Sequence, residues 1–134
     1  MKNIRIKILI TIFSMMLPYI LSAVEVDKKT AQSVAVSFWQ TELKMQSGKY
    51  SFDYEAVYDK HKSSQVLLHI FKTSNSFIIV SGDDAIFPIL GYSTESSYPQ
   101  KNQVLSFDWW IDNISASISK AINSRQIADK KVKE

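Results

Sequence analysis

Closely spaced apolar segments in the middle of the chain limit the folds that this sequence can adopt. Residues 66–72 are apolar on both faces, and residues 77–81 are dense in β-branched side chains. Only the polar residues 73–76 separate them, which predicts an antiparallel β-hairpin with a short loop. A third segment, 87–92, follows after Gly82-Asp83-Asp84, and its proline predicts an edge strand or a strand start. The sequence therefore predicts consecutive antiparallel strands.

The segments on either side of these strands have helical periodicity. Asp27 is predicted to cap a helix that ends near Leu43, and Ser106 is predicted to cap a second helix that frays after about Ser124. Residues 54–59 alternate in polarity and predict a weaker strand. The apolar face of the first helix comprises Ala31, Val34, Ala35, Phe38 and Leu43, with Trp39 at its edge. We expect an α+β domain: an antiparallel sheet of about four strands with an N-terminal and a C-terminal helix packed on one face.

Residues 1–23 have the order of features typical of a secretory signal peptide. Three basic residues precede the apolar stretch 8–21, and Leu21-Ser22-Ala23 ends the segment with small residues. The apolar stretch is short for a membrane-spanning helix, which needs about 20 residues. We therefore predict cleavage after Ala23 and export by the Sec route without membrane attachment, to the periplasm or outside the cell. The mature chain then divides into a domain, 24–124, and a charged C-terminal tail, 125–134.

The composition of the mature chain argues against several classes of function. All 13 acidic residues lie after residue 23, with 13 of the 16 basic ones, since the other three lie in the signal segment. The mature chain is thus nearly neutral and lacks the basic stripe typical of nucleic-acid binding. The absence of cysteine excludes thiol catalysis and disulfides.

The remaining polar residues do not form a recognisable catalytic or metal motif. His61 and His69 have no accompanying carboxylate cluster at the spacing of metal ligands. Gly82-Asp83-Asp84 lacks the further acids of a calcium loop, and the chain contains neither a phosphate-binding glycine loop nor a nucleophile elbow. We therefore expect a binding protein with no catalytic residues, no metal and no cofactor.

Two sequence blocks extend this interpretation. Residues 77–84 (FIIVSGDD) and 88–93 (PILGYS) resemble, in sequence and spacing, the paired blocks of the streptopain (peptidase family C10) prodomain and the related Spi protease inhibitors. The helical residues Ala31, Val34 and Phe38 support the resemblance, which covers residues 27–123. It implies a domain that covers the active-site cleft of a secreted C10-type cysteine protease. Because the chain ends soon after its last helix, the resemblance favours a separate inhibitor acting in trans, a monomer when free.

The resemblance also suggests where the protease would bind. An Asn that the family usually carries before the first block has no counterpart here, because Phe71 or Lys72 occupies its place. The candidate protease-binding residues are Phe71, Lys72, Thr73, Ser74, Asn75, Ser76, Gly82, Asp83 and Asp84. Lys72 and Asn75 are equally compatible with ordinary solvated turn residues. A detached propeptide that assists protease maturation and a non-inhibitory exported binding module remain alternatives, and the target protease is left open.

Overall fold

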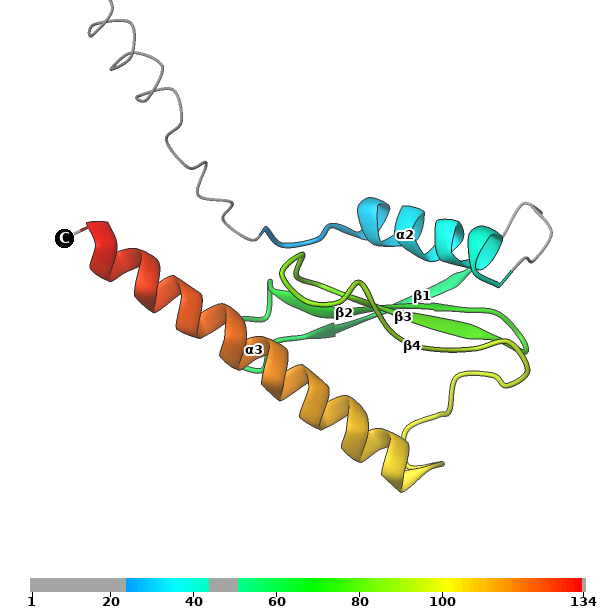
Figure 1. Ribbon diagram of the computed structural model, residues 1–134. Coiled ribbons are helices and arrows are strands. Elements are labelled where there is room, and N and C mark those ends of the chain that lie inside the picture. The colour runs from blue at the N-terminus through cyan, green and yellow to red at the C-terminus, as the bar shows by residue number, and fades with distance from the viewer. Residues whose placement is uncertain (1–23, 44–50, 134) are drawn as a thin grey trace, which may run out of the picture.

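The domain is a four-stranded antiparallel sheet between two helices (Figure 1). The computed structural model describes residues 24–43 and 51–133, with side chains through Arg125; the predicted signal peptide lies outside them. The strands follow the order β1-β2-β3-β4 in both sequence and space. The elements are α2 (Lys28–Thr41), β1 (Asp53–Tyr58), β2 (Val66–Lys72), β3 (Phe77–Ser81), β4 (Ile89–Ser93) and α3 (Leu105–Lys133). The predicted α+β class and the hairpin of β2 and β3 are therefore confirmed.

The two helices cover opposite faces of the sheet, so the prediction that both pack on one face was wrong (Figure 1). The cause is visible in β3, where all five residues are buried. Since successive side chains of a strand point to opposite faces, Ile78 and Val80 pack with α2, whereas Phe77 and Ile79 pack with α3. A central strand that is apolar on both faces requires a covering layer on each of them.

Several element boundaries differ from the sequence prediction. The cap of α2 is Asp27, as expected, because its Oδ1 accepts a hydrogen bond from the Thr30 amide at 2.9 Å. Helix α3 begins at Leu105, so Ser106 lies within its first turn and does not precede it. The helix also continues to Lys133, well past the predicted end near Ser124. Strand β4 starts only at Ile89.

Trp39 belongs to the core and not to the edge of the helical stripe. It lies one helical turn after Ala35, which is also buried, so both side chains point at the sheet. Its ring stacks on Phe52 with centroids 5.1 Å apart. This contact attaches the C-terminal end of α2 to the segment that leads into β1.

No helix in the described part of the chain is long and apolar enough to cross a bilayer.

Candidate functional site

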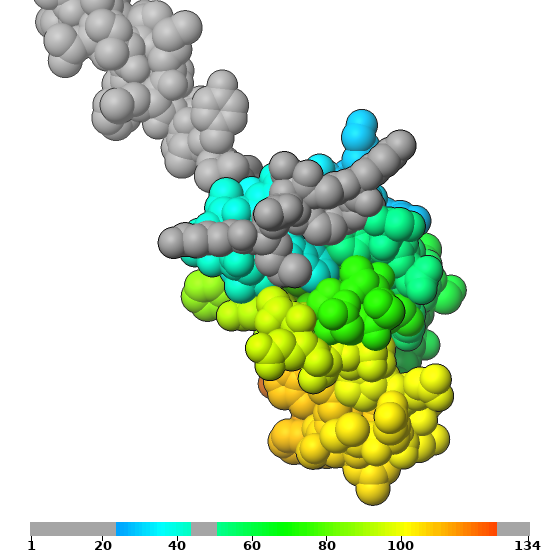
Figure 2. All heavy atoms as spheres, turned by 90° about the vertical axis from the view of Figure 1, so that its right-hand side faces the viewer, coloured from blue at the N-terminus to red at the C-terminus, as the bar shows by residue number. Residues whose placement is uncertain are grey.

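The turn between β2 and β3 is fixed by its own hydrogen bonds and exposes its tip. The Thr73 amide donates to the Ser76 carbonyl at 2.9 Å, and the hydroxyl groups of the same two residues lie 2.6 Å apart. Ser76 is buried beneath the turn, whereas Ser74 and Asn75 are exposed. Figure 2 views the molecule onto this end, where the turn lies at the surface in bright green. The turn therefore exposes two polar side chains on a backbone that hydrogen bonds hold in place.

The two residues at the base of the turn have structural contacts. Phe71 is only 1% exposed and packs between the rings of Phe52 and Tyr54, with centroid distances of 5.9 and 5.4 Å. Lys72 Nζ lies 2.7 Å from Glu55 Oε2, across the pairing of β1 with β2. A partner protein therefore has access to Lys72, which is partly exposed, but not to Phe71.

Aromatic contacts connect this turn to the start of α3. The rings of Phe77, Tyr98 and Phe107 form a mutual edge-to-face cluster with centroid distances between 5.3 and 6.0 Å. Lys72 Nζ also lies 5.3 Å from the centroid of Tyr98. Burial, with the nearby charges of Glu55 and Asp108, raises the pKa of the Tyr98 hydroxyl to about 12. Tyr98 thus stays neutral and holds the loop before α3 against the hairpin.

Three apolar side chains at the start of α3 are exposed near this cluster, and they were absent from the predicted site. Leu105 is 74% exposed and Trp109 is 68% exposed, and Val104 precedes them. Figure 2 shows their segment in yellow, on the same face as the turn and below it. The sequence did indicate that one tryptophan would be exposed here, because Trp109 and Trp110 are adjacent in a helix and cannot both face the core.

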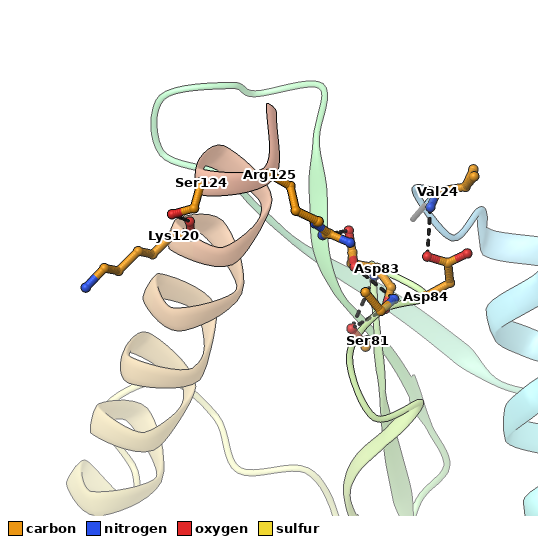
Figure 3. A network of polar contacts seen from close by, with 8 residues as sticks. Val24, Ser81, Asp83, Asp84, Lys120, Ser124 and Arg125 are labelled. Carbon is orange, nitrogen blue, oxygen red and sulfur yellow. Dashed lines mark hydrogen bonds and ion pairs between the residues drawn. The ribbon is translucent and has the colours of Figure 1, made fainter. Parts of the chain in front are cut away.

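The predicted residues Gly82, Asp83 and Asp84 lie at the other end of β3 from the turn. Gly82 packs so tightly that an added Cβ atom would lie 2.2 Å from the Val66 carbonyl oxygen. Asp83 is only 4% exposed, and its Oδ2 lies 2.6 Å from Arg125 Nη2 (Figure 3). Asp84 is exposed. The structure thus brings together the residues from Phe71 to Ser76, but it separates them from Gly82, Asp83 and Asp84.

His69 is a buried structural histidine. Its Nε2 atom donates to the Val26 carbonyl at 2.7 Å, so Nδ1 accepts from the Tyr54 hydroxyl at 2.9 Å. Burial lowers the pKa of the imidazole and favours this neutral form. Among the residues that the structure describes, no three His, Cys, Asp or Glu side chains are grouped so that they could hold a metal ion.

One of the comparisons with known proteins identifies a family for this chain. No curated protein and no solved structure matches it significantly. A model of a protein family does match, over residues 23–118, and its description is Spi protease inhibitor. The matched region includes α2, the whole sheet and the first half of α3. The chain therefore belongs to the Spi protease inhibitor family.

Proposed function

We propose that this protein is an exported inhibitor of a streptopain-type (C10) cysteine protease, which it blocks in trans by covering the active-site cleft. Membership of the Spi protease inhibitor family is the observation that carries the proposal. The chain contains no cysteine, so the catalytic thiolate would belong to the partner. The inhibitor itself would have no catalytic activity and would need no cofactor.

The export part of this proposal rests on the N-terminal sequence. Residues 1–23 would be removed as a signal peptide, and the domain 24–124 with its charged tail 125–134 would act in the periplasm or outside the cell. The free protein would be a monomer without membrane attachment.

The β2–β3 turn is the element that we propose enters the cleft. Its tip residues Ser74 and Asn75 are exposed, while the strands that carry it are buried on both faces. Such a turn loses little conformational entropy on docking, because its hydrogen bonds already hold it in shape. Gly82 and Asp83 would support the loop after β3 and not touch the protease, since both are buried.

The exposed apolar side chains at the start of α3 would anchor the complex beside the cleft. The segment that carries Val104, Leu105 and Trp109 lies on the same face as the turn (Figure 2), and the aromatic cluster connects the two. Tryptophan residues at interface centres often contribute 2 kcal/mol or more to binding, on the order of a 30-fold change in affinity. We expect Trp109→Ala to weaken inhibition by about that factor.

The test is inhibition of purified C10-type proteases by residues 24–134, with papain as a specificity control. Two matched variants, Ser74→Trp and Ser117→Trp, each add a bulky ring to an exposed serine. Ser117 lies on α3 outside the core clusters. We expect residues 24–134 to inhibit the C10-type protease in a 1:1 complex without affecting papain. Ser74→Trp should abolish this inhibition, and Ser117→Trp should retain it.

Other outcomes would point to the alternatives. Rapid digestion of the domain, combined with a higher refolding yield of the protease, would favour a maturation helper. The absence of any protease contact would favour an exported binding module. Equal inhibition by both tryptophan variants would exclude the turn as the inserted element.

A further inference from the structure

The first described residues run alongside the connection between β3 and β4. The Val26 amide donates to the Gly82 carbonyl at 2.9 Å, and the Asp84 amide donates to the Val24 carbonyl at 3.3 Å. Between these bonds, Glu25 and Asp83 pair as an antiparallel bridge. The segment 24–26 therefore behaves as a short extra strand on the loop after β3.

The nitrogen atom at the beginning of this segment lies beside a carboxylate. Val24 N is 2.7 Å from Asp84 Oδ1, as the dashed line in Figure 3 shows. The neighbouring carboxylate of Asp83 has its own cation, because Arg125 Nη2 lies 2.6 Å from it. Within the described ranges 24–43 and 51–125, no Lys or Arg side chain forms an ion pair with Asp84.

Removal of the signal peptide would change the chemistry of this nitrogen. In the uncleaved chain, Val24 N is a neutral amide with a single N–H. Cleavage after Ala23 would turn the same atom into a primary amine with an ordinary pKa of about 7.7–8.0, protonated at neutral pH and below. The family match begins at residue 23, one residue before this proposed N-terminus.

We infer that Asp84 is the binding site for the α-ammonium group of Val24, created when the signal peptide is removed. The amide–carboxylate hydrogen bond of the precursor would become an ion pair with a charge-assisted hydrogen bond, which is the stronger type. Processing would thereby complete the attachment of residues 24–26 to the sheet.

The contacts of this segment show what the ion pair would secure. The Val26 carbonyl accepts the hydrogen bond of His69 on β2, and Glu25 Oε1 accepts from the Val66 amide at 3.3 Å. The segment thus connects the start of β2 to the loop after β3. An uncleaved chain would hold the same contacts without the ionic attachment, so the exported form would be the more stable one.

The experiment compares two forms of the protein by thermal unfolding at pH 6.5. One form begins at Val24, and the other carries a neutral Gly-Ser-Gly-Ser extension before Val24. Each form is prepared with Asp84 and with Asp84→Asn. We expect the form that begins at Val24 to have a Tm about 2–4 °C higher, and we expect this difference to disappear with Asp84→Asn.

Asp53→Asn is the matched control, since Asp53 is also exposed but lies on β1, away from the N-terminal segment. It should leave the difference in Tm between the two forms unchanged. An equal difference with Asp84 and with Asp84→Asn would overturn the inference, as would a mass spectrum of the exported protein that begins at another residue. Because no protease is present, these results are independent of the inhibition assay; the inference requires only the proposed cleavage.

Discussion

The ion pair between Arg125 and Asp83 joins the C-terminal half of α3 to the loop after β3. Arg125 Nη2 lies 2.6 Å from Asp83 Oδ2, and the other carboxylate oxygen accepts from the Ala85 amide at 3.0 Å. The Asp83 side chain is 5% exposed and that of Arg125 is 34% exposed. Arg125 lies beyond residue 118, where the family match ends. Replacing it with glutamine tests whether this part of the helix belongs to the folded domain.

The expected destabilisation follows from these exposures. Removing one partner of a fully buried ion pair costs about 3–5 kcal/mol, and an exposed pair contributes about 0–1 kcal/mol. This pair is intermediate, because Arg125 is one-third exposed and Asp83 keeps the Ala85 amide as a donor. We therefore expect Arg125→Gln to lower the free energy of unfolding by about 1–2 kcal/mol. For a domain of about 110 residues, this corresponds to a fall in Tm of about 4–8 °C.

The assay is thermal unfolding followed by circular dichroism. Lys120→Gln is the matched control, because it also removes one positive charge from α3. Lys120 is exposed, and Figure 3 shows that its side chain points away from Asp83. A double-mutant cycle with Asp83→Asn isolates the pairwise interaction. If Arg125→Gln had the same Tm as Lys120→Gln, or if the cycle gave no coupling, the ion pair would not stabilise the fold.

Two further predictions concern stability. Gly82→Ala places a Cβ atom 2.2 Å from the Val66 carbonyl oxygen and should lower the free energy of unfolding in urea by about 2 kcal/mol. In the control Gly91→Ala, the nearest contact of the added Cβ atom is 3.4 Å, so the free energy of unfolding should change by less than about 0.5 kcal/mol. Equal effects of the two substitutions would contradict the steric argument. The pKa of His69 is lowered from 6.5 by burial, so below that pH the unfolded chain binds more protons than the folded one. The free energy of unfolding should therefore fall between pH 7.5 and 5.5, and a slope that persists in His69→Gln would assign the effect to other groups.

The strands and the first helix were predictable because local signals agreed with the final packing. Residues 66–72 and 77–81 form strands with the predicted bounds, and Asp27 caps α2 as its side chain suggested. The sequence blocks 77–84 and 88–93 also indicated the Spi protease inhibitor family, to which the family match assigns the chain. In each case, the residues that carry the signal are close together in the sequence.

The end of α3 was less predictable, because its apolar stripe weakens after Ile122. The helix nevertheless continues to Lys133, and Arg125 finds its partner in a loop 42 positions earlier in the chain. Sequence periodicity reports a helix face that packs on a core, but it does not report an ion pair with a distant loop. The predicted tail 125–134 thus begins with a residue that contacts the domain.

The candidate site shows the same division between local and tertiary information. The sequence by itself determined the hairpin and its polar turn, since these depend on local residue types. Only the tertiary structure decided that Gly82 and Asp83 are buried, and that the segment at the start of α3 lies on the same face as the β2–β3 turn. It also decided which helix covers which face of the sheet. The physical reason is that burial and proximity depend on how elements pack, and two apolar faces of one strand do not specify which helix covers each.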